Sequence, residues 1–139
     1  LYEKCLKGMY ENDPDMLCKL ARCEYGLGDY AAVIVLLDRL KQHNPDYRNA
    51  DAHLLYAMAL AAQGKSSEAL HEYEALHRYY PGPEATCRYA QLLQTLNRNS
   101  EAQALFAEVV AKAKIAGKHY VSLHKAWVDL AKKSAGNGK

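Results

Sequence analysis

The feature that most constrains this chain is a paired-helix pattern between Asn49 and Pro83. Apolar or small side chains recur at helical spacing through its first half, stop at Gly64, and resume until just before Pro81. The recurring positions are Leu54, Leu55, Ala57, Met58, Leu60 and Ala61, followed by Ala69, Leu70, Tyr73 and Leu76. A segment with this spacing is expected to fold as two packed helices joined by a tight turn, a helix hairpin.

The same spacing occurs once upstream and once downstream of this hairpin. Ala21 and Ala90 take the place of Ala57, and Gly28 and Asn97 take the place of the glycine turn. The full matches read Leu17-x2-Leu20-Ala21-x2-Glu24 with Val33-x3-Leu37, and Thr86-x2-Tyr89-Ala90-x2-Leu93 with Ala102-x3-Phe106. Three copies at a period of about 34 residues predict an array of stacked hairpins.

The order of residues within each copy resembles the tetratricopeptide repeat. In the central copy it reads His53-x2-Tyr56-Ala57-x2-Leu60, then Ala69-x3-Tyr73, then Pro81. The resemblance implies an all-α, right-handed superhelix of about three hairpins that binds other proteins without catalysis. We assign one domain to 1–133, with repeats at about 14–47, 50–82 and 83–116, a leading helix over Leu1 to Tyr10, a closing helix at about 118–133, and a disordered tail at 134–139.

Composition and motif content narrow the function further. The net charge of +2 on 139 residues is too close to neutral to indicate nucleic-acid binding. The six histidines are scattered, and no nucleophile, phosphate-loop or metal-ligand motif is present, so we expect no enzyme activity, cofactor or metal. The spacing of the four cysteines does not fit a zinc site, and it favours reduced, packed thiols in a cytoplasmic domain.

The inner face of such an array is expected to bind a protein or peptide partner. In tetratricopeptide arrays the inward positions lie one, five and eight residues beyond the first motif residue. They predict a groove lined by Cys18, Arg22, Tyr25, Leu54, Met58, Cys87 and Gln91, with Lys19, Leu55 and Arg88 beside them. Arg22 and Arg88 have two open roles: gripping an acidic partner, or pairing within the chain with Asp15, Asp51 or Glu84.

A second surface is predicted in the helix of the first repeat that runs from Tyr30 to His43. Its segment 31–37 is apolar on every face. Either neighbouring helices cover it, or Ile34, Val35 and Leu36 form a self-association surface that makes a homodimer.

The chain is strongly basic toward its end. From Lys112 onward there are seven lysines against Asp129 alone. This run is either a solvated end or a surface that attracts an anionic membrane or an acidic partner.

Several phrases of the sequence resemble a group of bacterial proteins with divergent tetratricopeptide repeats. They include LYEKCLKGMYENDP, LKQHNPD, HLLYAMAL, YYPGPEA and HKAWVDLAKK. The resemblance implies a parent protein that is attached to the bacterial inner membrane. The attachment would use a segment ahead of the repeats, outside this chain.

Overall fold

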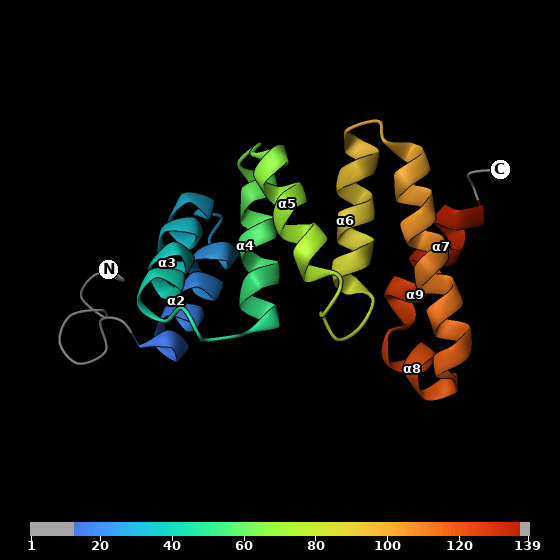
Figure 1. Ribbon diagram of the computed structural model, residues 1–139, viewed down its shortest axis with the longest axis horizontal. Coiled ribbons are helices and arrows are strands. Elements are labelled where there is room, and N and C mark those ends of the chain that lie inside the picture. The colour runs from blue at the N-terminus through green and yellow to red at the C-terminus, as the bar shows by residue number, and fades with distance from the viewer. Residues whose placement is uncertain (1–12, 137–139) are drawn as a thin grey trace. The chain divides into compact units, whose positions relative to one another are not determined.

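The computed structural model describes residues 13–136, and within this range every regular element is an α-helix (Figure 1). The helices are α2 (Pro14–Gly26), α3 (Tyr30–His43), α4 (Ala50–Ala62), α5 (Ser66–Leu76), α6 (Glu84–Thr95), α7 (Asn99–Ala116), α8 (Lys118–Leu123) and α9 (Lys125–Gly136). The predicted all-α class is confirmed. The leading helix predicted over Leu1 to Tyr10 lies outside the described residues.

The chain divides into two compact units. Unit 1 comprises residues 1–72 and unit 2 comprises residues 73–139, so the boundary falls within α5 and within the second predicted repeat. Each unit has its own buried core.

Short polar side chains begin the helices of unit 1. The side chains of Asp13, Asp29 and Asn49 accept hydrogen bonds from the backbone N–H groups of Met16, Ala32 and Ala52, at 2.9, 3.1 and 3.0 Å. Each bond satisfies one of the amides that the first turn of a helix leaves without a partner. The turns between helices use Gly28 and Gly64, whose φ angles of 81° and 78° favour glycine.

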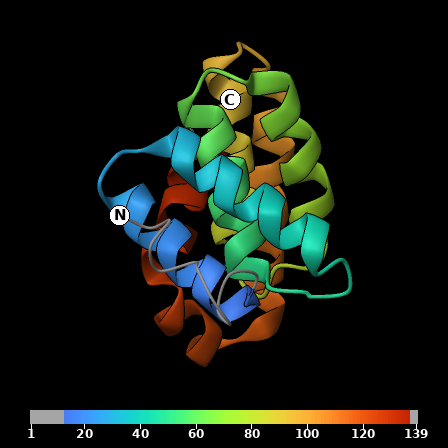
Figure 2. The same cartoon turned by 90° about the vertical axis from the view of Figure 1, so that its left-hand side faces the viewer.

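The core of unit 1 forms where α3 contacts both α2 and α4 (Figure 2). The small motif residues Ala21 and Ala57 are fully buried, because they stand where two helix backbones approach each other. Leu17, Val33 and Leu36 fill the space around them and are also almost completely buried. The small residue that recurs in the sequence therefore has a packing role.

The core of unit 2 forms where α7 contacts both α6 and α9. Ala90 takes the same role as Ala21 and Ala57, and the aromatic ring of Phe106 is almost completely buried. Leu93 and Val128 complete the contact. The turn between α6 and α7 contains Asn97 at a φ of 62°, a conformation that asparagine tolerates better than most residues.

The closing segment differs from the single helix expected at about 118–133. It forms α8 and α9, with a break at His124, whose imidazole lies against the backbone of Gly82. A Cβ atom at Gly82 would lie only 2.9 Å from the imidazole, so this close approach requires glycine. Helix α9 also continues to Gly136, so the first part of the predicted tail is helical, and 137–139 lie outside the described residues.

None of the described helices is both long enough and apolar enough to cross a bilayer.

Candidate functional site

The predicted groove residues of unit 1 separate into a surface group and a core group. Lys19 and Arg22 are exposed on α2, and Tyr25 beside them is half-buried. Leu55 and Met58 are half-buried on α4, which contacts α2. These five residues, which we call the α2–α4 surface, are accessible to a partner of unit 1.

Cys18 and Leu54 do not belong to that surface. Their exposed fractions are only 7% and 5%, because they face neighbouring helices of the same unit. Burial raises the pKa of the Cys18 thiol, and the hydroxyl of Tyr47 hydrogen-bonds to it. The position one residue beyond the first motif residue is thus a packing position here, which corrects the sequence-based assignment.

The two candidate arginines have different surroundings. In unit 2, Nε of Arg88 donates to Oε2 of Glu84 at 2.8 Å, and its guanidinium carbon lies 5.0 Å from the centre of the Trp127 ring. Of the two roles left open for this arginine, binding an acidic partner or pairing within the chain, Arg88 therefore has the second. Arg22 makes no ion pair within the described part of the chain.

The remaining groove residues lie in unit 2. Gln91 is half-buried on α6, whereas Cys87 on the same helix is fully buried. The Cys87 thiol donates to the carbonyl oxygen of Trp127 at 3.6 Å, and burial raises its pKa to about 12. Cys87 is therefore a protonated core residue, and its side chain does not line a surface.

The predicted self-association residues are mostly covered. Ile34 and Leu36 are buried, since α3 packs against α2 and α4 at once. Val35 is 58% exposed. Neighbouring helices therefore cover Ile34 and Leu36, which is the first of the two alternatives. Of the three predicted self-association residues, only Val35 lies on the surface.

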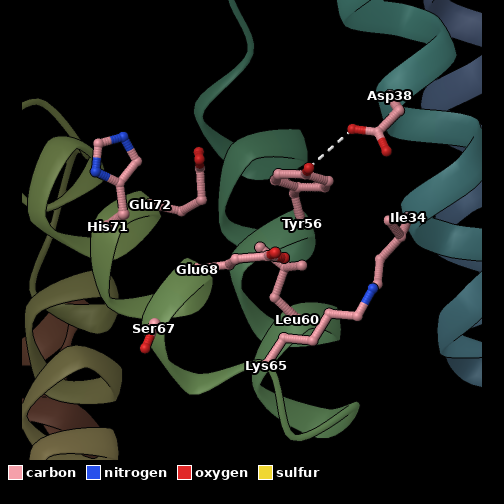
Figure 3. A pocket seen from close by; sticks show the side chains of 9 residues that line it. All are labelled: Ile34, Asp38, Tyr56, Leu60, Lys65, Ser67, Glu68, His71 and Glu72. Atoms are coloured by element: carbon pink, nitrogen blue, oxygen red, sulfur yellow. Dashed lines mark hydrogen bonds between the residues drawn. The ribbon is translucent and has the colours of Figure 1, made fainter.

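A hollow of about 560 Å³ opens between α3, α4 and α5 of unit 1 (Figure 3). We call it the acidic hollow, because its lining contains three carboxylates and one lysine: Ile34, Asp38, Tyr56, Leu60, Lys65, Ser67, Glu68, His71 and Glu72. None of these three carboxylates was among the site residues predicted from the sequence. No sequence pattern links Asp38 on α3 to these glutamates, because only the packing of α3 on α4 brings them to one hollow.

Two of the three carboxylates already have partners within unit 1. The hydroxyl of Tyr56 donates to Oδ1 of Asp38 at 2.8 Å, and burial together with this carboxylate raises the pKa of Tyr56 (Figure 3). Oε1 of Glu72 lies 2.8 Å from Nε2 of His53, a hydrogen bond that lowers the pKa of Glu72 although burial opposes it. These bonds fix the walls of the hollow. Asp38 and Glu68 are exposed, whereas Glu72 is half-buried.

A second hollow, of about 500 Å³, lies in unit 2 beside the ends of α7 and α8 and the start of α9. We call it the basic hollow, because three lysines and one aspartate contribute to its lining: Ala113, Lys114, Gly117, Lys118, Val121, Ser122, Lys125 and Asp129. Nζ of Lys125 lies 2.6 Å from Oδ2 of Asp129, and both side chains are mostly exposed. The two units therefore carry hollows of opposite charge.

The part of the chain that the structure describes contains no group of three or more side chains arranged to hold a metal ion. The two hollows are lined mainly by charged and polar side chains. Both are suited to binding charged groups.

Part of the chain matches the model of a known family. The tetratricopeptide repeat matches residues 25–86, which contain α3, α4 and α5 and the first residues of α6. Repeats of this family generally mediate protein–protein interaction, and the helical structure described above fits a helical repeat solenoid. No curated protein matches the chain.

Proposed function

We propose that this chain is a non-enzymatic interaction module that binds a protein or peptide through the α2–α4 surface. The observation that carries the proposal is the position of Arg22, an exposed cation without an ion pair among the described residues, on a helix that contacts the one carrying Leu55 and Met58. A charged donor next to accessible apolar side chains is a combination that peptide-binding surfaces use.

The chemistry of this surface defines the partner. The guanidinium of Arg22 can form two parallel hydrogen bonds with a carboxylate, and Lys19 adds a second positive charge on the same helix. Met58 is flexible and polarisable, so it can adapt to differently shaped apolar side chains. The expected ligand is a peptide segment in which an acidic residue stands near an aliphatic or aromatic one.

A charge-reversal experiment tests the proposal. Arrayed peptides that vary in charge and apolar content are probed with the full chain, and binding is then measured by fluorescence anisotropy. We expect acidic, apolar-anchored peptides to bind, Arg22→Glu to shift the preference toward basic peptides, and Met58→Glu to weaken both. Lys41→Glu, an exposed change on α3, is the matched control.

Two results would contradict this proposal. One is an unchanged peptide preference in an Arg22→Glu protein whose circular dichroism shows that it is folded. The other is an equal loss of binding in the Lys41→Glu control, which would indicate a general charge effect.

Self-association is the second candidate, and the 58% exposure of Val35 favours it. Val35 would form the centre of a contact between two copies of α3. Light scattering coupled to size-exclusion chromatography should then show a mass that rises toward two chains with concentration, and Val35→Glu should restore one chain. A constant mass of one chain up to about millimolar concentration, where an association as weak as about 4 kcal/mol would show, removes this candidate.

A further inference from the structure

The basic hollow of unit 2 is the described surface where positive charge is most concentrated. Residues 112–136 contain six lysines and Asp129 as the only acid, and three of those lysines line the hollow. Asp129 can neutralise Lys125, its neighbour at 2.6 Å, but it leaves Lys114 and Lys118 without a carboxylate in the lining. The hydroxyl of Ser122 adds a neutral hydrogen-bond donor.

Two strongly exposed aliphatic side chains follow residues of this hollow in the sequence. Ile115 is 88% exposed and directly follows Lys114, and Leu123 is 68% exposed and directly follows Ser122. Neither side chain lines the hollow. Transfer of an exposed aliphatic side chain from water to an apolar phase is favourable. Negative charge on the same phase would attract the neighbouring lysines.

We propose that the basic hollow, with Ile115 and Leu123 beside it, binds the surface of a membrane rich in anionic phospholipid. Lys114 and Lys118 would bind lipid phosphates, and the two aliphatic side chains would enter the boundary between headgroups and acyl chains. This combination of lysines with projecting aliphatic residues is how proteins lie on a bilayer without spanning it.

The exposure of the aliphatic residues decides between a bilayer and an acidic peptide. A peptide bound in the hollow would contact its lining and leave Ile115 at 88% exposure in water. A bilayer, by contrast, is wide enough to contact the lysines and both projecting side chains together. The proposal concerns unit 2 alone and does not depend on the peptide-binding function proposed for the α2–α4 surface.

Vesicle flotation with the full chain tests the proposal. We expect the protein to float with vesicles of phosphatidylcholine and phosphatidylglycerol in equal parts and to remain in solution with pure phosphatidylcholine. Each lysine near an anionic leaflet contributes a factor of about five to partitioning, so Lys114→Gln/Lys118→Gln should bind about 25-fold more weakly. Lys41→Gln/Arg48→Gln removes the same charge from unit 1 at exposed positions and should bind like the unaltered chain.

Two further variants separate the contribution of charge to vesicle binding from the contribution of the apolar side chains. Ile115→Ser/Leu123→Ser keeps every lysine and should still weaken vesicle binding, because the apolar contribution is lost. Asp129→Asn removes the one carboxylate of the hollow and should strengthen binding, because Lys125 no longer has a competing partner.

Several outcomes would overturn the proposal. Equal flotation with both kinds of vesicle, or no flotation with either, would exclude anionic lipid as the ligand. Displacement from vesicles by millimolar inorganic phosphate would assign the hollow to a free phosphate. Unchanged binding by the Lys114→Gln/Lys118→Gln protein, or an equal loss in the unit 1 control, would place the membrane contact elsewhere.

Discussion

The two units are built from the same kind of helix packing and carry hollows of opposite charge. In unit 1 the hollow gathers Asp38, Glu68 and Glu72, and hydrogen bonds within the unit hold two of these carboxylates. In unit 2 the hollow gathers three lysines with a single carboxylate. The packing positions of a helix hairpin thus fix the scaffold, whereas the surface positions between them are free to set the charge.

The cores of the units differ as well. Unit 1 buries many aliphatic side chains from α2, α3 and α4, whereas unit 2 also buries two aromatic side chains, Tyr73 and Phe106. Side-chain caps begin α2, α3 and α4, whereas α6, α7 and α8 begin without one. Unit 1 should therefore depend more on local caps, and unit 2 more on its buried aromatic side chains.

The largest expected effect comes from emptying the core of unit 2. Phe106→Ala should lower the free energy of unfolding by about 3–5 kcal/mol, because it removes a buried ring and leaves a cavity. Urea denaturation followed by circular dichroism measures the change. Leu27→Ala, at a side chain that is largely exposed, is the control. A loss below about 1 kcal/mol would mean that the neighbours of Phe106 collapse into the space.

A smaller effect is expected from the caps. Asn49→Ala should cost about 1 kcal/mol, because the first turn of α4 loses the acceptor for the amide of Ala52. Arg98→Ala changes the corresponding position of α7, which has no side-chain cap, and loses only an exposed ion pair with Glu101, so it should cost less than Asn49→Ala. Equal losses in the two variants would contradict the proposed difference between the units.

The pair of His53 and Glu72 should make the acidic hollow sensitive to pH. Because the hydrogen bond from His53 holds the pKa of Glu72 below its ordinary value of 4.5, its stabilisation is present at neutral pH and is lost as the pH falls below that value. Glu72→Gln should therefore be less stable than the unaltered chain at neutral pH. The two urea midpoints should converge in acid, and a constant difference would show that the charge of Glu72 is not the cause.

The smallest effect is expected at the edge of the basic hollow. Lys125 and Asp129 are both largely exposed, and solvent screens such pairs. Asp129→Asn should therefore leave the thermal unfolding midpoint unchanged, even though it removes the single carboxylate of the hollow. A clear drop in the midpoint would mean that this pair holds α9 in place.

Periodicity made most of the helices predictable. The recurring alanine and the glycine or asparagine in the turns indicated the hairpins. The burial of Ala21, Ala57 and Ala90 shows that this alanine is a packing position. The break at His124 was not predictable, because it lies where the imidazole packs against Gly82, about forty residues earlier in the chain.

The surface residues were harder to predict than the helices. Arg22 and Met58 are accessible as expected, but Cys18, Leu54 and Cys87 belong to the cores. The reason is geometric, since a small error in the rotation of a helix about its axis exchanges a surface position for a packing position.

The sequence alone determined that this protein is built from helix hairpins, because the spacing of apolar residues along a helix indicates which of its faces is buried. It also revealed the basic character of the end of the chain. Only the tertiary structure decided which charges share a hollow, as Asp38 joins Glu68 and as Lys114 joins Lys125. Those neighbours come from different helices, and their proximity depends on packing that no local pattern encodes.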